Sequence, residues 1–86
     1  MESHEVLSDL QTIFDELFLE PVRLAPELSA KEVDEWDSLL HISILAATEE
    51  RFGIKFRTGE VEGTHNVGEF VALIRGHLDR KNGLSI

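Results

Sequence analysis

The residues best placed to do chemistry in this sequence are Asp37 and Ser38, which are followed by Leu39. They lie where an acidic connection that contains prolines gives way to an apolar segment with helical spacing. A serine at the start of a helix presents its hydroxyl to solvent. A phosphate joined to that hydroxyl would lie where unpaired backbone N–H groups and the helix dipole favour negative charge. Ser38 is therefore a candidate attachment point for a prosthetic group, and Asp37 is the expected N-cap of the helix.

His41 follows Ser38 by one helical turn and suggests a second chemistry. A serine and a histidine can act as nucleophile and general base, but such a pair also needs an orienting acid, an oxyanion site and a pocket. None of these three is readable in the sequence around Ser38. A small hydrolase that uses Ser38 and His41 remains an alternative, and the preferred interpretation places His41 near whatever Ser38 carries.

Metal and thiol chemistry have no support in the composition. The sequence contains no cysteine, so it offers no disulfide, no thiolate ligand and no protein thiol nucleophile. The remaining histidines are scattered without metal-ligand spacing, and the acids before Ser38 lack the glycine and the spacing of a calcium loop. We therefore expect no metal site.

Hydrophobic spacing predicts an all-α chain with three main helices. They run from His4 to Phe18, from Ser38 to Phe52, and from about Val67 to the segment 81–83. The residues expected to face the core from the first and last of these are Val6, Leu10, Ile13, Phe14 and Leu17, and Val67, Phe70, Val71, Ile74 and Leu78.

The connection between the first two helices is long and contains Pro21 and Pro26, which interrupt regular helix. Residues 29–32 have the form of a capping box and predict a brief turn, residues 59–62 predict another turn, and residues 66–69 form a second capping box. The apolar residues of the long connection should pack over the core: Val22, Leu24, Leu28 and Val33. The expected architecture is a four-helix bundle with three main helices and one short one, in a single domain that spans residues 1–86.

The helix that begins at Ser38 carries two apolar stripes on opposite faces. The stripe expected to face the core consists of His41, Ile44, Leu45, Thr48 and Phe52, and the second stripe consists of Leu39, Ile42, Ser43, Ala46 and Glu50. The offset of two residues between them is about 200° around a helix. Leu39, Ile42 and Ala46 would then form an exposed apolar strip, with Asp37, Glu49 and Glu50 at its border. Such a strip is a candidate protein-docking surface, unless the long connection covers it.

The charge of the sequence is concentrated in its first part. The formal net charge is -9, and residues 1–50 hold thirteen of the seventeen acids but two of the eight bases. An acidic field of this kind repels nucleic acid and anionic lipid and attracts basic protein surfaces. No apolar run approaches the roughly 20 residues that span a bilayer, and the first residues lack the basic start of a signal peptide. We expect a cytoplasmic monomer whose partners are proteins, with no nucleic acid or membrane among them.

Together these features resemble the acyl carrier protein family. The resemblance covers nearly the whole sequence: an amphipathic first helix, a long loop, Asp37-Ser38-Leu39 opening the second helix, the run 49–54 closing it, and a final helix. It implies that Ser38 carries 4′-phosphopantetheine through a phosphodiester. The arm would supply the thiol that the cysteine-free chain lacks. It also implies a phosphopantetheinyl transferase as a partner, with Asp37 near the Mg²⁺ ion that this enzyme uses.

The sequence departs from the carriers of ordinary fatty-acid synthesis around the serine. Those carriers usually have glycine two residues before it, where this sequence has Trp36, and tend to place acids just after it, where Leu40 and Ser43 stand. A more apolar front surface should suit different partner enzymes. Asp37 argues against a peptidyl carrier, in which glycine or histidine is more usual at that position.

The sequence thus predicts a carrier protein and not an enzyme, in fatty acid, polyketide or other specialised biosynthesis. Ser38 would carry the arm, and Leu39, Ile42, Ala46, Glu49 and Glu50 would present it to loading and processing enzymes with basic docking surfaces. The alternative from another class is an acidic helical interaction module that uses the same apolar strip and is never modified.

Overall fold

The computed structural model describes residues 2–57 and 59–83. Over these residues the chain forms three α-helices and two single-turn 3₁₀ helices, and contains no strand. The α-helices are α1 (Ser3–Leu17), α2 (Ser38–Phe52) and α3 (Val67–Gly83), and the 3₁₀ helices are η1 (Ala30–Glu32) and η2 (Val61–Gly63). The three predicted main helices are confirmed. Helix α1 begins and ends one residue before its predicted bounds. The turns predicted at 29–32 and 59–62 correspond to η1 and η2, and each is a single 3₁₀ turn.

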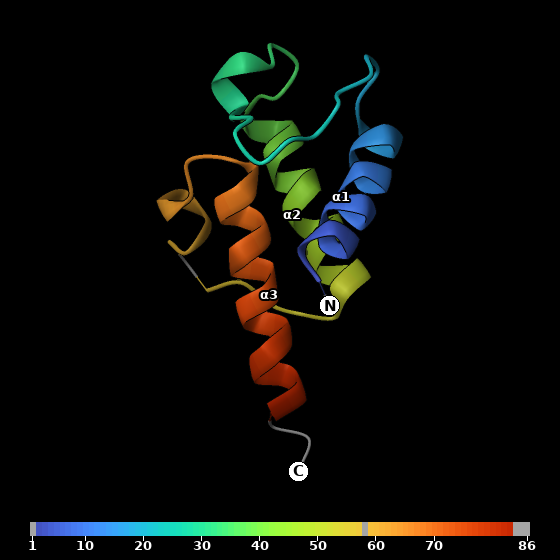
Figure 1. Ribbon diagram of the computed structural model, residues 1–86. Helices are drawn as coiled ribbons and strands as arrows, with labels where there is room; N and C mark the ends of the chain where they lie inside the picture. Colours follow the sequence, from blue (N-terminus) through green and yellow to red (C-terminus); the bar gives the residue numbers. More distant parts are fainter. Residues whose placement is uncertain (1, 58, 84–86) are drawn as a thin grey trace.

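Helix α1 packs against both α2 and α3. In Figure 1, α1 runs upward while α2 and α3 run downward, and the end of α1 lies near the start of α2 at the upper end of the molecule. The start of α3 lies against the start of α1, where Ser3 and His4 line a shallow pocket with Gly68 and Val71. Ser38 is at the upper end, because it is the first residue of α2. Helix α2 ends at Phe52, at about the level of the middle of α3 in this view.

The ends of the helices follow from local capping. Glu2 is the N-cap of α1 in a capping box with Glu5. Asp37 is the N-cap of α2, and Gly53 ends this helix in the left-handed region at φ 65°, a conformation that glycine adopts at little cost. Both caps of α2 are as predicted. At the start of α3 the Asn66 side chain accepts from the Glu69 N–H at 2.8 Å, which is half of the predicted capping box.

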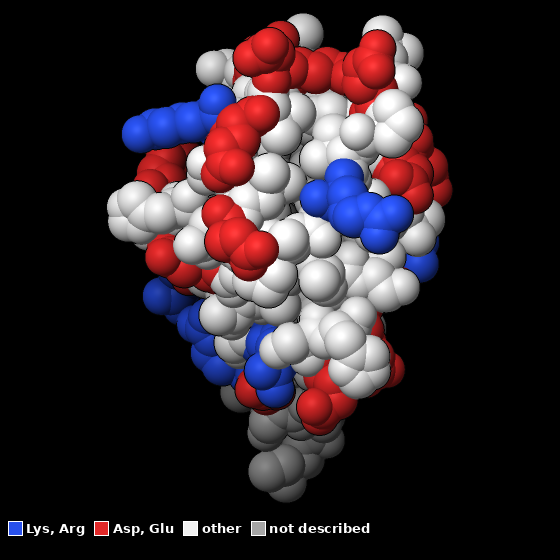
Figure 2. Space-filling view, turned by 45° about the horizontal axis from the view of Figure 1, so that its top comes forward, with Lys and Arg blue, Asp and Glu red and all other residues white. Residues whose placement is uncertain are grey.

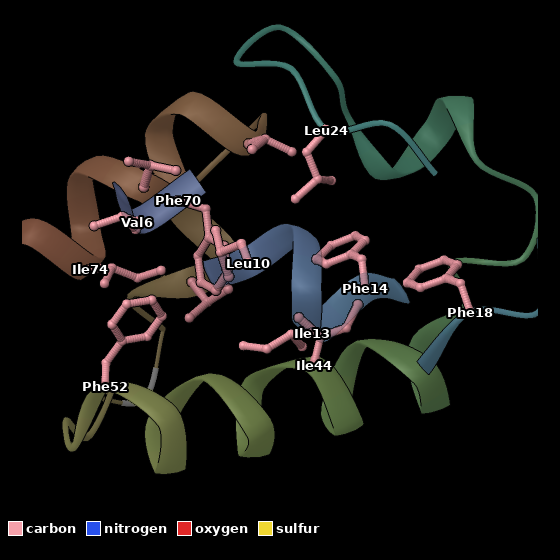
Figure 3. Close-up of a cluster of buried hydrophobic side chains, with 13 residues drawn as sticks. Val6, Leu10, Ile13, Phe14, Phe18, Leu24, Ile44, Phe52, Phe70 and Ile74 are labelled. Atoms are coloured by element: carbon pink, nitrogen blue, oxygen red, sulfur yellow. The ribbon is translucent and has the colours of Figure 1, made fainter. Parts of the chain in front are cut away.

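The core is a single cluster to which all three α-helices contribute (Figure 3). Its buried apolar residues are Val6, Leu10, Ile13, Phe14, Phe18, Leu24, Ile44, Phe52, Val61, Val67, Phe70, Val71 and Ile74. The inward faces predicted for α1 and α3 are therefore confirmed, with Leu17 and Leu78 partly buried at the edge of the cluster. Thr48 is buried as well, and its hydroxyl is satisfied because it donates to the Ile44 carbonyl.

The long connection packs on the core as predicted, with Leu24 buried and Val22, Leu28 and Val33 partly buried. The Gln11 side chain of α1 holds it in place, because its amide donates to the Val22 carbonyl at 2.7 Å and accepts from the Leu24 N–H at 2.9 Å. The turn predicted at 59–62 forms slightly later, as η2. Val61 opens this turn and is buried, which draws the turn against the core.

Candidate functional site

Ser38 is exposed at the first position of α2, immediately after the N-cap. The Asp37 carboxylate accepts from the Leu40 N–H at 2.8 Å and so satisfies one of the unpaired donors at the start of the helix. No described protein group hydrogen-bonds to the Ser38 side chain. The Ser38 hydroxyl is thus free to react, at the helix end whose dipole favours an attached phosphate.

Trp36 and His41 form a pair on either side of Ser38 in the sequence. The Trp36 Nε1–H donates to His41 Nδ1 at 3.1 Å. The Trp36 ring meets Phe14 edge to face with ring centroids 5.1 Å apart, and it meets Phe18 in the same way at 6.2 Å. These contacts fix the segment that leads into Ser38 against the end of α1.

Ser38 and His41 do not form a catalytic dyad in this structure. His41 Nδ1 already accepts from Trp36, and no hydrogen bond joins His41 to Ser38 in the described part of the chain. No carboxylate among the described residues orients His41. The geometry therefore gives no support to the hydrolase alternative, which requires a base that contacts the serine and an acid that contacts the base.

A cavity of about 180 Å³ lies beside this pair. Trp36 and His41 line one side, η2 and the start of α3 line the other, and Phe70 contributes from α3. The half-buried place of His41 in this lining agrees with its predicted position on the inward stripe of α2.

The predicted apolar strip is uncovered. The side chains of Leu39 and Ile42 are 75% and 63% exposed, and Ala46 is exposed as well. On the opposite face, Ile44, Thr48 and Phe52 are buried. The two-stripe interpretation of α2 is therefore correct, and the long connection does not cover the outer stripe.

The two glutamates predicted to border the strip differ in their surroundings. Glu50 is exposed. Glu49 is half-buried, and its carboxylate accepts from the Phe56 N–H at 2.8 Å, so it holds the segment that follows α2 against the helix. The carboxylates of Glu49 and Asp37 therefore each hold a backbone N–H group. Asp37 is nevertheless exposed, as is Glu50, whose carboxylate has no bond to a described residue.

Sequence patterns gave no sign of Glu35 as a contributor to this end of the molecule. Its carboxylate accepts from the N–H groups of Leu19 and Glu20, at 2.7 and 3.1 Å, just beyond the end of α1. This contact ties the end of α1 to the segment that leads into Ser38. It leaves the Leu19 side chain 93% exposed. Nothing in the spacing of Glu35 and Leu19 could have predicted a bond across fifteen or more residues.

The surface charge is unevenly placed (Figure 2). Acidic side chains lie along the top of this view and on both of its sides, and basic side chains lie at its lower left, with separate ones at the upper left and right of centre. Among the described residues, no three histidine, aspartate or glutamate side chains come together as metal ligands. No helix in the described ranges is long and apolar enough to cross a membrane.

Comparison with known proteins identifies the class. No family model matches the chain. The chain is 32% identical over 79 residues to the meromycolate extension acyl carrier protein of Mycolicibacterium aurum, across 91% of this chain and 80% of that protein. It is 31% identical to the protein of the same name from Mycobacterium tuberculosis strain H37Rv, across 91% of this chain and 68% of the relative.

A solved structure agrees with these relatives. The solution structure of holo acyl carrier protein from Geobacter metallireducens matches with a TM-score of 0.82 and 35% identity, over 91% of both chains. The fold and the exposed serine at the start of α2 define a carrier domain. The chain belongs to the acyl carrier protein family.

Membership of this family settles several predictions. The chain is an acyl carrier with the acyl-carrier bundle and is not an enzyme, which removes the hydrolase alternative. The match to a holo protein also supports the predicted cofactor, a covalently bound phosphopantetheine arm. Biosynthetic enzymes and a phosphopantetheinyl transferase are the partners that the family implies.

Proposed function

We propose that Ser38 is the residue to which the 4′-phosphopantetheine arm is attached. The observation that carries this proposal is the exposed Ser38 hydroxyl at the first position of α2, with no protein partner among the described residues. The N–H groups of Ser38 and Leu39 open the helix and have no intrahelical acceptor, so a phosphodiester fits there. The terminal thiol of the arm supplies the thioester chemistry that this cysteine-free chain cannot provide.

Asp37 has two roles in this proposal. Its carboxylate holds the first turn of α2 through the Leu40 N–H, which fixes the backbone that carries Ser38. The same carboxylate lies next to the serine and is exposed, so it can face the transferase and its Mg²⁺ during attachment. It needs no other metal ligand from this chain, because phosphate oxygens and water commonly complete a Mg²⁺ shell.

The apolar strip presents the loaded arm to partner enzymes. Leu39, Ile42 and Ala46 supply exposed apolar contact area on the helix that begins at Ser38, and Asp37 and Glu50 supply charge at its border. Basic partners would be attracted by these acids, and the apolar residues would be buried on docking. Glu49 contributes to this surface through the backbone segment it holds.

The cargo we propose belongs to a specialised pathway. Trp36 stands two residues before Ser38 and is packed on Phe14 and Phe18, while Leu40 and Ser43 follow where acids are usual in ordinary fatty-acid carriers. The relatives named above act, by their names, in meromycolate extension. The cavity lined by Trp36 and His41, which lie on either side of Ser38 in the sequence, is the place we propose for contact between the protein and the arm or its cargo.

Intact-mass measurement tests the attachment. The unmodified protein is incubated with coenzyme A, Mg²⁺ and a broad-specificity transferase, beside Ser38→Ala and Ser43→Ala. Wild type and Ser43→Ala should each gain one phosphopantetheine, and Ser38→Ala should gain none. An equal gain on Ser38→Ala would contradict the proposal by placing the arm on another residue. No gain on wild type would contradict it in favour of the unmodified interaction module.

A further inference from the structure

Half of the lysines and arginines of this acidic chain gather around one surface pocket. Lys55, Arg57, Arg80 and Lys81, four of the eight such residues, line a pocket of about 420 Å³. The pocket lies between the segment that follows α2 and the last turns of α3, with His77 at its inner side. This is the lower end of the molecule in Figure 1, opposite the end that holds Ser38.

The positive charge at this pocket is only partly balanced within the described chain. Glu60 is the acid that contacts it: its carboxylate accepts from the Arg57 N–H at 2.7 Å, contacts His77 Nε2 at 2.9 Å and forms a long ion pair with the Arg80 guanidinium at 3.9 Å. The Arg57 N–H above all, then His77, keep the pKa of Glu60 below its usual value, although burial opposes this. The side chains of Lys55, Arg57 and Lys81 form no ion pair with any described residue.

Gly53 gives the Lys81 ammonium its place in the pocket. A Cβ added to Gly53 would lie 2.6 Å from Lys81 Nζ, so the ammonium occupies the space that a side chain would fill. This position is at the C-terminal end of α2, where the helix dipole is negative and attracts a cation. Lys81 is thereby held near Lys55 and Arg57 although all three repel one another.

We propose that this basic pocket binds an acidic segment of a partner protein. The pocket is open to solvent, and its four cations come from two separate segments, so it suits an extended chain with several carboxylates. The planar guanidinium groups of Arg57 and Arg80 match carboxylates in geometry. A net charge of -9 weakens binding to nucleic acid or anionic lipid as whole surfaces, whereas a short acidic segment meets the basic pocket alone.

This surface can be occupied while Ser38 is in use. Helix α2 has fifteen residues, which at 1.5 Å per residue places about 22 Å between its two ends. A partner segment bound beside Gly53 therefore leaves the start of α2, with Ser38 and Leu39, uncovered. Such a contact would hold the carrier near an enzyme assembly without competing for the arm.

An NMR titration of the full-length, unmodified protein with a hexaglutamate peptide tests the proposal. The backbone amide signals of residues 53–57 and 77–81 should shift, and those flanking Ser38 should not. The triple variant Lys55→Gln, Arg57→Gln, Lys81→Gln should bind roughly tenfold more weakly, since three of the four cations that line the pocket lose their charge. Arg23→Gln with Lys31→Gln, two exposed cations elsewhere, is the matched control and should bind as wild type does.

The proposal is overturned by no shift with the peptide, by equal binding of the triple variant, or by shifts of the same size and place with inorganic pyrophosphate in place of the peptide. Binding to phosphatidylserine vesicles in preference to the peptide would also overturn it. Because the titration uses unmodified protein, Ser38→Ala should bind the peptide as wild type does. A failure here is thus distinct from a failure of the attachment proposal.

Discussion

At the scale of single residues, Asp37 and Ser38 have different roles at the start of α2. The Asp37 carboxylate takes the Leu40 N–H and closes the first turn, which leaves the Ser38 side chain exposed and without a protein partner among the described residues. A reactive hydroxyl is most accessible where it makes no bond of its own. The capping acid therefore fixes the backbone, and the serine stays available for modification.

Removal of the Asp37 cap should cost measurable stability. Asp37→Ala is expected to lower the free energy of unfolding by about 1 kcal/mol, because the Leu40 N–H loses its acceptor, whereas Asp37→Asn should retain most of it. Urea unfolding followed by circular dichroism gives the values. Asp34→Ala, at an exposed acid with no such bond, is the control, and an equal loss in the two alanine variants would show that the cap does not contribute.

Glu60 should make stability depend on pH. Its pKa is lowered in the folded chain, first by the Arg57 N–H and then by His77, so it stabilises the fold at pH values above its unfolded pKa of about 4.3. This contribution is lost as the pH falls through the still lower folded pKa. The difference in Tm between wild type and Glu60→Gln should therefore be largest near neutral pH and shrink in acid.

Glu62→Gln provides the comparison for this pH dependence. Glu62 is exposed and close in sequence to Glu60, but its carboxylate has no bond to a described residue. Its substitution should leave the pH profile of Tm as in wild type. A Glu60→Gln profile that runs parallel to that of wild type at every pH would contradict the assigned role of Glu60.

Which residue contacts could be predicted depended on their distance in sequence. The Asp37 cap and the exposed Ser38 follow from patterns within four residues, and both are confirmed. The Trp36–His41 hydrogen bond and the contact from Glu35 to Leu19 were not predicted, because each depends on how the long connection folds back onto α1. A sequence shows which polar groups exist, but the tertiary packing decides which of them meet.

At the scale of elements, α2 has one face in the core and one face in solvent. The inward face of Ile44, Thr48 and Phe52 is buried, and the outward face exposes Leu39 and Ile42. A helix in a small protein normally exposes polar residues on its outer face. The uncovered apolar side chains therefore support the proposal that partner enzymes dock on this face.

Ile42 and Ile44 offer a matched test of these faces. Ile44→Ala should lower the free energy of unfolding by about 2–5 kcal/mol, because Ile44 is fully buried and its truncation leaves a cavity. Ile42→Ala, at a side chain 63% exposed, should change it by less than about 0.5 kcal/mol but should slow modification by the transferase. Urea unfolding and the initial rate of modification measure the two effects.

One combination of results would contradict this assignment of the two faces of α2. If Ile42→Ala destabilised the protein as much as Ile44→Ala and left the modification rate unchanged, the outer face would be structural. Ala72→Asp, an exposed position on α3, controls for any general effect of altering the surface.

Helix positions were predictable because periodicity and caps are local. The bounds of α2 match the prediction, with Asp37 and Gly53 as its caps, and the two stripes follow from the spacing alone. The position of η2 was less predictable, since Val61 is drawn into the core by contacts with distant residues. Similarly, no pattern shows that Gln11 secures the long connection through Val22 and Leu24.

At the scale of the whole molecule, the two ends carry different charge and different tasks. The end that holds Ser38 is rich in acids and presents the apolar strip, and the far end gathers four of the eight lysines and arginines. The acidic half was evident from the sequence. The basic pocket was not, because it forms when segments about twenty residues apart are brought together by the fold.

The central claim is that the arm is attached to Ser38 and to no other residue. Its most direct test is proteolysis of the protein after incubation with coenzyme A, Mg²⁺ and a transferase, followed by tandem mass spectrometry that locates the added group. We predict that the phosphopantetheine lies on the peptide containing residues 37–39, with fragments that assign it to Ser38. Its location on another serine, such as Ser29 or Ser43, or its absence from every peptide of the treated protein, would contradict the account.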